Sequence, residues 1–167
     1  MSEPIVVLYK SKSCRHCEDL SKIWDNGTDS VVNSLKKVYP KLRFFVLETN
    51  DNTGKFDENT APKDVKRYGK WFPMVLLIPG RVWDVAMSKL GPKSDATIID
   101  GVQIMNGYLK NGNVEMLHKY DTRKTAEFAK WLKDALENEE FKKIQNSTSS
   151  LHRTKNQTKL GPCRAIY

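Results

Sequence analysis

A short apolar run that ends just before two closely spaced cysteines constrains the fold of this chain most. The run Ile5–Tyr9 is bounded by polar residues and is too short for the apolar core of a signal peptide, so it predicts a buried β-strand. Beyond a polar turn, Cys17 and Trp24 fall on one helical face, which predicts a helix over residues 14–24. Cys14 and Cys17 are therefore expected on the first turn of a helix that follows a strand.

The remaining pattern alternates between strands and helices. We expect the following elements: a helix capped by Thr28 or Asp29 and stopped by Pro40, a strand over 42–47, a short helix over 62–68, a strand over 74–78, two strands over 102–109 and 114–119 joined by an Asn-Gly turn, and a last helix starting at Thr122 or Thr125. This order predicts an α/β fold, with a central mixed sheet flanked by helices and an insertion at about residues 81–101.

The charge of the chain is concentrated at its C-terminal end. The 167 residues carry a net charge of +8, of which +6 belongs to residues 142–167, a stretch without any acidic residue. We therefore expect one folded domain over residues 1–141 and a flexible, disordered basic tail over 142–167. The tail is a candidate for nonspecific contact with a polyanion, and a merely solvated tail is the alternative.

We expect neither a targeting segment nor a membrane span. No apolar run approaches the roughly 18 residues of a membrane helix, so we expect no membrane partner. Without an export signal, the chain is expected to be intracellular and cytoplasmic. In that reducing compartment a cysteine pair is more often catalytic, redox-sensing or metal-binding than structural.

The motif Cys14-Arg15-His16-Cys17 has the spacing that redox chemistry needs. Residues three apart on a helix are close enough for a disulfide, and free N–H groups at the helix start stabilise a thiolate. We assign Cys14 as the attacking nucleophile and Cys17 as the thiol that resolves the mixed disulfide. Arg15 and His16 add positive charge, and a cationic His16 would make the pair more oxidising.

Other uses of the cysteines stay open at this point. A Cys-x-x-Cys pair also occurs in zinc sites, but the two further ligands would have to come from Cys163, His118 and His152, which are scattered along the chain. Two structural cysteines are a second alternative. We expect no metal and no cofactor. Cys163, in the tail, is a candidate regulatory thiol, with an inert thiol as the alternative.

Two segments together resemble the thioredoxin-like family. They are Val6-Val7-Leu8-Tyr9 followed by the Cys14–Cys17 motif, and Ala61 with Tyr68-Gly69-Lys70-Trp71-Phe72-Pro73-Met74-Val75-Leu76-Leu77. The resemblance spans about residues 4–140 and implies a thioredoxin-like fold. It implies that Pro73 is a cis-proline lying against the cysteines and that the backbone of Phe72 pairs with a substrate peptide. A trans-proline at a strand edge is the alternative.

The chain departs from the family at two positions, where Leu8 replaces a buried acid and Ser13 replaces a tryptophan. The Cys-x-His-Cys form is similar to that of disulfide isomerases and oxidants. Glutathione contacts of glutaredoxins find no clear match, so glutathione is not an expected partner. The Trp71-Phe72 segment and residues 106–109 resemble uncharacterised thioredoxin-like proteins of large DNA viruses, which adds incorporation in a virus particle as an expectation.

These features predict a thiol–disulfide oxidoreductase that acts on protein thiols. Trp71 and Phe72 are predicted to bind the protein substrate as an apolar platform, with core packing as the alternative, and Arg15 is predicted to assist. The alternative function is a thioredoxin-fold interaction or structural protein with weak or no redox activity, which binds a partner or polyanion through its surface and basic tail. The oligomeric state is left open.

Overall fold

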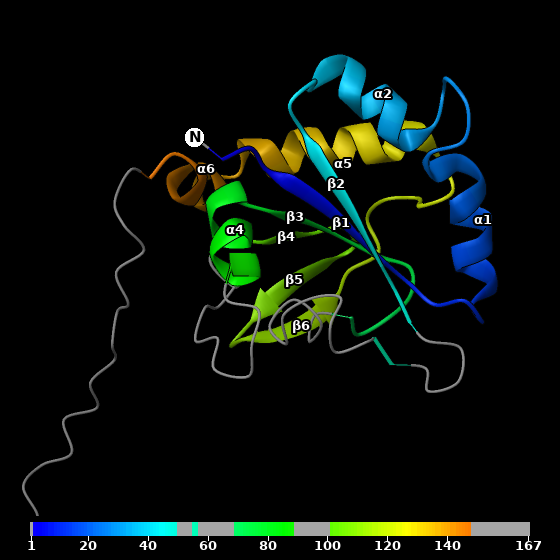
Figure 1. Cartoon of the computed structure of the whole chain (residues 1–167). Helices are drawn as coiled ribbons and strands as arrows, with labels where there is room; N and C mark the ends of the chain where they lie inside the picture. The colour runs from blue at the N-terminus through cyan, green and yellow to red at the C-terminus, as the bar shows by residue number, and fades with distance from the viewer. Residues whose placement is uncertain (1, 50–54, 57–68, 89–100, 148–167) are drawn as a thin grey trace, which may run out of the picture.

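A four-stranded mixed sheet forms the centre of the protein (Figure 1). The computed structural model describes residues 2–49, 55–56, 69–88 and 101–147. The strand order is β2-β1-β3-β4, and the strands are β1 (Ile5–Lys10), β2 (Arg43–Glu48), β3 (Met74–Ile78) and β4 (Gln103–Ile104). Strand β1 is parallel to β2 and antiparallel to β3, and β4 is antiparallel to β3. The predicted mixed sheet of an α/β protein is thus confirmed.

Helices cover both faces of this sheet (Figure 1). One face packs against four of them: α1 (Arg15–Trp24), α2 (Val31–Val38), α5 (Thr125–Glu137) and α6 (Glu139–Gln145). The other face packs against α4 (Gly80–Ser88) and against a separate hairpin of β5 (Gly107–Lys110) and β6 (Asn113–Met116). None of the helices in the described part of the chain is long and apolar enough to cross a membrane.

Strand β1 lies between two apolar cores because its side chains alternate between the two faces. Val6 and Leu8 belong to the core under α1, α2 and α5, whereas Ile5, Val7 and Tyr9 belong to the core on the α4 side. All five residues are at most 4% exposed. The continuous apolar run therefore has the simple physical cause that both faces of the strand are covered.

Two predicted helix starts differ from the structure. Cys14 is the N-cap of α1 and lies just outside the helix, whose first residue is Arg15. Helix α2 is capped by Ser30 and not by Thr28 or Asp29, because the Ser30 hydroxyl accepts a hydrogen bond from the N–H of Asn33 at 3.2 Å.

The predicted single strand over residues 102–109 is wrong, because a turn at Asn106 divides this segment into two strands. This residue has a φ of 59°, in the left-handed region, and separates β4 from β5. The Asn-Gly hairpin is confirmed, with positive φ at Asn111 and Gly112. The second strand of the hairpin ends at Met116, so His118 lies beyond it rather than in the predicted strand 114–119.

The predicted insertion and tail boundaries change in part. Residues 80–88 form helix α4, whose Val82, Trp83 and Ala86 are buried against the sheet. The proposed tail start at residue 142 falls inside helix α6, because Phe141 is buried and the helix continues to Gln145. The predicted helix at 62–68, the region 89–100, Cys163 and residues 148–167 lie outside the described residues.

Candidate functional site

Cys14 lies between the end of strand β1 and the start of helix α1. As N-cap of α1 it has an extended backbone, and its Sγ accepts a hydrogen bond from the N–H of Cys17 at 3.3 Å. Its side chain is partly exposed, and both cysteines are free thiols. A sulfur in this position faces the N–H groups at the helix start that have no partner within the helix.

Cys17 lies one turn further along α1 and is only 2% exposed. Burial raises the pKa of its thiol to about 12, and its hydrogen bond with Cys14 adds to this increase. Two groups act in the opposite direction on the pKa: the N–H of Ser11, which donates to Cys17 Sγ at 3.5 Å, and the ammonium group of Lys10. Cys17 is therefore a protected, protonated thiol beside a more accessible one.

The segment before β3 lies against this pair. The Phe72–Pro73 peptide bond is cis, as the family resemblance implied. The thiol of Cys14 donates to the carbonyl oxygen of Phe72, with Sγ and O 3.6 Å apart. The side chain of Cys14 thus contacts a backbone carbonyl 58 positions further along the sequence.

The aromatic side chains of this segment pack against other parts of the core. The ring of Phe72 meets the ring of Phe56 edge-on at 5.8 Å, and Phe56 in turn meets Tyr9. Trp71 packs over Gly107, where a Cβ would come within 2.9 Å of its indole ring. Both Trp71 and Phe72 are partly buried against the core on the α4 side, in keeping with the core-packing alternative.

Arg15 and His16 are exposed on the first turn of α1. His16 lines a cleft of about 520 Å³, whose other wall is the segment His118–Arg123 between the hairpin and α5. Asp121 in this wall is held by Arg123, whose Nε donates to the carboxylate at 3.0 Å and keeps the pKa of Asp121 below its usual value. The cleft therefore borders the cysteine motif on the side of His16.

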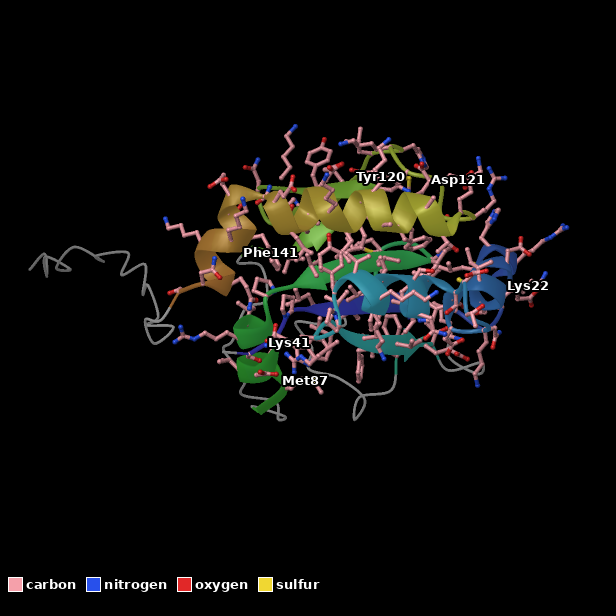
Figure 2. The ribbon with its side chains drawn as sticks, turned by 90° about the horizontal axis from the view of Figure 1, so that it is seen from above. Lys22, Lys41, Met87, Tyr120, Asp121 and Phe141 are labelled. Atoms are coloured by element: carbon pink, nitrogen blue, oxygen red, sulfur yellow. The ribbon has the colours of Figure 1, made fainter. Side chains whose placement is uncertain are left out.

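Asn106 organises this wall, and the sequence pattern did not single it out. Its side-chain oxygen accepts from the N–H groups of Lys119 and Tyr120 at 2.9 and 2.7 Å, and its amide donates to the Tyr120 carbonyl at 2.8 Å. Tyr120 also donates to Asp134 on α5 at 2.6 Å, so the wall is tied to that helix (Figure 2). The Asn106-Gly107 pair is itself a turn signal, which a strand prediction across it overlooked.

Two lysines and one glutamate lie at the end of β1 beside the cysteine motif. Lys10 and Glu48 are register partners on the parallel strands β1 and β2, and Lys10 Nζ is 3.0 Å from the Glu48 carboxylate. Lys12 Nζ is 3.8 Å from the same carboxylate. Leu8, on the same face of β1 as Lys10, is buried and apolar.

Among the described residues, no group of three or more His, Cys, Asp or Glu side chains is arranged to hold a metal ion. His118 lines the cleft with His16, whereas Cys163 and His152 lie outside the described residues.

Comparison with known proteins yields no relative: no family model, no curated protein and no solved structure matches this chain.

Proposed function

We propose that the protein is a thiol–disulfide oxidoreductase of thioredoxin-like fold that acts on protein thiols through Cys14 and Cys17. The strand order β2-β1-β3-β4, with the cysteines following β1 and the cis-proline preceding β3, supports the fold assignment. The site lies at the C-terminal end of a parallel strand, where open α/β sheets commonly bind their ligands.

One observation carries this proposal: the two thiols lie together but in contrasting surroundings. Cys14 is partly exposed and receives the N–H of Cys17, whereas Cys17 is 2% exposed and has a raised pKa. An accessible sulfur meets the substrate first, and a protected sulfur can act only after the first has formed a bond. This order is what an attacking and a resolving cysteine require.

The reaction follows from these positions. The Cys14 thiolate attacks one sulfur of a substrate disulfide, so a Cys14–substrate S–S bond forms and the departing substrate sulfur takes up a proton. Cys17 then loses its proton and attacks Cys14 Sγ, which breaks the mixed disulfide and releases the second substrate thiol. The substrate disulfide is reduced by two electrons and the Cys14/Cys17 pair is oxidised to a disulfide; the reverse sequence oxidises a dithiol.

The substrate chain has a place to bind beside the reacting sulfur. The Phe72 carbonyl lies 3.6 Å from Cys14 Sγ and is a hydrogen-bond acceptor for a peptide N–H once the thiol has been consumed. The cleft beside His16 offers about 520 Å³ for side chains that flank the reactive cysteine. Both features favour a polypeptide substrate.

The test uses the two single cysteine variants of the full chain. Insulin reduction with a dithiol reductant should proceed with the wild type and be lost in Cys14→Ala. Cys17→Ala should instead accumulate a covalent adduct with substrate protein that dithiothreitol releases. Turnover by Cys14→Ala at the wild-type rate would refute the proposal, as would wild-type protein that neither reduces insulin nor refolds scrambled ribonuclease.

A further inference from the structure

The second half of the proposed reaction places a specific demand on Cys17, and the following inference rests on that proposed function. Cys17 must become a thiolate to attack the mixed disulfide, although it is 2% exposed and burial raises its pKa to about 12. In the mixed disulfide Cys14 carries no proton and no charge, so its own influence on Cys17 disappears. Burial then remains as the main obstacle, and some group has to offset it.

The charged groups that act on Cys17 are few. In the part of the chain that the structure describes, its thiol is influenced by the sulfur of Cys14, the N–H of Ser11 and the ammonium group of Lys10, and no carboxylate is among these groups. Leu8, which precedes Lys10 on the same strand face, is apolar. Ser11 N–H favours the thiolate most, and Lys10 favours it to a smaller extent. Lys10 is the only side chain of the two, and it directly precedes Ser11, whose N–H lies 3.5 Å from the sulfur.

Strand geometry places Lys10 on the same side of the sheet as Cys17. Side chains of β1 alternate, and Val6 and Leu8 lie in the core that α1 covers together with Leu20 and Trp24. Lys10 continues this even-numbered series at the last position of β1, so it lies on the face of the sheet that α1 covers. Cys17 lies on the buried side of α1 with Leu20 and Trp24.

The position of Lys10 is secured from the neighbouring strand. Its Nζ is 3.0 Å from the carboxylate of Glu48, and the two side chains are about equally shielded, with 26% and 31% of their surface exposed. Because Lys10 and Glu48 are register partners at the last positions of β1 and β2, this ion pair joins the ends of two paired strands. An ammonium group held near a buried sulfur acts through a medium of lower dielectric constant than water.

We propose that the Lys10 ammonium group stabilises the Cys17 thiolate in the release step, acting through its electric field and without contacting the substrate. The proton leaves Cys17 for water, the thiolate forms the Cys14–Cys17 bond, and the Cys14–substrate bond breaks with the electron pair leaving on the substrate sulfur. Lys10 keeps its own proton throughout. Lys10 therefore acts only by placing a positive charge, and its ion pair with the Glu48 carboxylate keeps that charge in position.

The experiment separates the two chemical steps. The reduced full-length protein is mixed with a peptide dimer joined by one disulfide, quenched with acid at successive times and alkylated. Mass spectrometry then measures the mixed disulfide and the intramolecular disulfide. In Lys10→Met the release rate near neutral pH should fall roughly three- to tenfold, since a tenfold change corresponds to about one unit in the pKa of Cys17. The rate of mixed-disulfide formation should not change.

A change in the pH profile distinguishes this effect from a structural one. The release rate rises with pH as Cys17 ionises, and its profile should shift to higher pH in Lys10→Met. Lys10→Arg keeps the charge and should restore the wild-type profile. Lys22→Met removes a positive charge from the exposed side of α1, where Lys22 pairs with Asp19 at 3.1 Å, and should behave as the wild type. If Lys10→Met does not fold, Lys10→Gln replaces it.

Four results would contradict either this inference or the proposed function. A release rate in Lys10→Met equal to that of the wild type at every pH would overturn this inference and leave the proposed function intact. Equal slowing by Lys22→Met, or no rescue by Lys10→Arg, would also overturn it. If the wild type forms no mixed disulfide at all, it is the proposed function that fails.

Discussion

Burial of one thiol and exposure of the other is the residue-scale feature that matters most. Cys17 and Cys14 are separated by one helical turn, yet Cys17 lies against Leu20 and Trp24 in the core while Cys14 caps the helix at the surface. The difference comes from the helical face on which each sulfur lies. It gives the pair its order of reaction and also links the ionisation of Cys17 to the stability of the fold.

This link predicts that the reduced protein loses stability at high pH. The pKa of Cys17 rises from 9.0 to about 12 on folding, so below about pH 9 the thiol is protonated in both states and its contribution is fully present. Between these values the unfolded thiol ionises while the folded one does not. The free energy of unfolding should therefore fall with rising pH, by up to about 1.4 kcal/mol per pH unit from this group.

Urea unfolding under reducing conditions measures this effect. The slope of the free energy of unfolding between about pH 9 and about pH 10.5 should be steeper in the wild type than in Cys17→Ala, which lacks the ionising group. Lysines and tyrosines titrate in both proteins and cancel in the comparison. Parallel pH profiles would contradict the raised pKa of Cys17.

At the scale of elements, helix α5 is long and amphipathic but lacks a side-chain N-cap. Its N-cap residue, Lys124, has the extended backbone of a cap, yet its side chain accepts no hydrogen bond from the first turn. Phe128, Trp131, Leu132 and Ala135 bury the apolar face against the sheet, so packing stabilises the helix in spite of its weak start. Helices α1, α2 and α6, in contrast, are capped by side chains.

Replacing this cap should stabilise the protein. Lys124→Ser supplies an oxygen to the first turn, in which the Glu127 carboxylate already accepts a hydrogen bond from the N–H of Asp121 at 3.3 Å. We expect the free energy of unfolding to increase by about 1 kcal/mol. The lost ion pair with Asp121, 3.9 Å long with Lys124 70% exposed, counts for little.

Thermal and urea unfolding of Lys124→Ser and Lys124→Ala provide the measurement. Both variants remove the same charge, but only the serine variant adds a cap. A Lys124→Ser protein no more stable than Lys124→Ala would show that the start of α5 is already satisfied in another way.

At the scale of the whole molecule, the two ends of the described chain meet on the same side of the sheet. The side chain of Gln145 in α6 donates to the carbonyl of Ser2 and accepts from the N–H of Gly80 in α4, both at 2.8 Å. Arg43 of β2 adds an ion pair with Asp84 of α4 and a hydrogen bond to the Glu3 carbonyl. Phe141 points from α6 toward the sheet (Figure 2). This region lies at the opposite end of β1 from the cysteines.

These contacts predict where the folded domain can be cut. A chain ended at Ser147 keeps Gln145 and Ile144, which packs against the core, whereas a chain ended at Phe141 loses both. We expect the shorter chain to be less stable by about 2 kcal/mol or more, from two lost hydrogen bonds and the apolar surface that Ile144 buries.

Urea midpoints of the two truncated chains test this expectation directly. Both lack residues 148–167, so the comparison isolates the last turn of α6. Gln145→Ala in the longer chain should account for part of the difference. Equal midpoints for the two chains would show that the domain is complete at residue 141, as the charge pattern alone suggested.

Local chemistry explains why several elements could be predicted. A few consecutive residues are enough to predict each of three features: the apolar run of β1, the helical spacing of Cys17, Leu20 and Trp24, and the Asn111-Gly112 turn. Where a choice depended on distant partners, the predictions failed. Ser30 and not Thr28 caps α2, and Asn106 interrupts a strand because its amide binds a segment more than ten residues later.

The sequence by itself therefore determined the α/β pattern, the placement of two cysteines at the start of a helix and the concentration of charge beyond residue 141. Only the tertiary structure decided that the Phe72 carbonyl reaches Cys14, that Lys10 shares a sheet face with the core beneath α1, and that α6 belongs to the folded domain. The physical reason is range. Periodicity and turn chemistry act over a few residues, whereas a site is made by segments that pack together from distant parts of the chain.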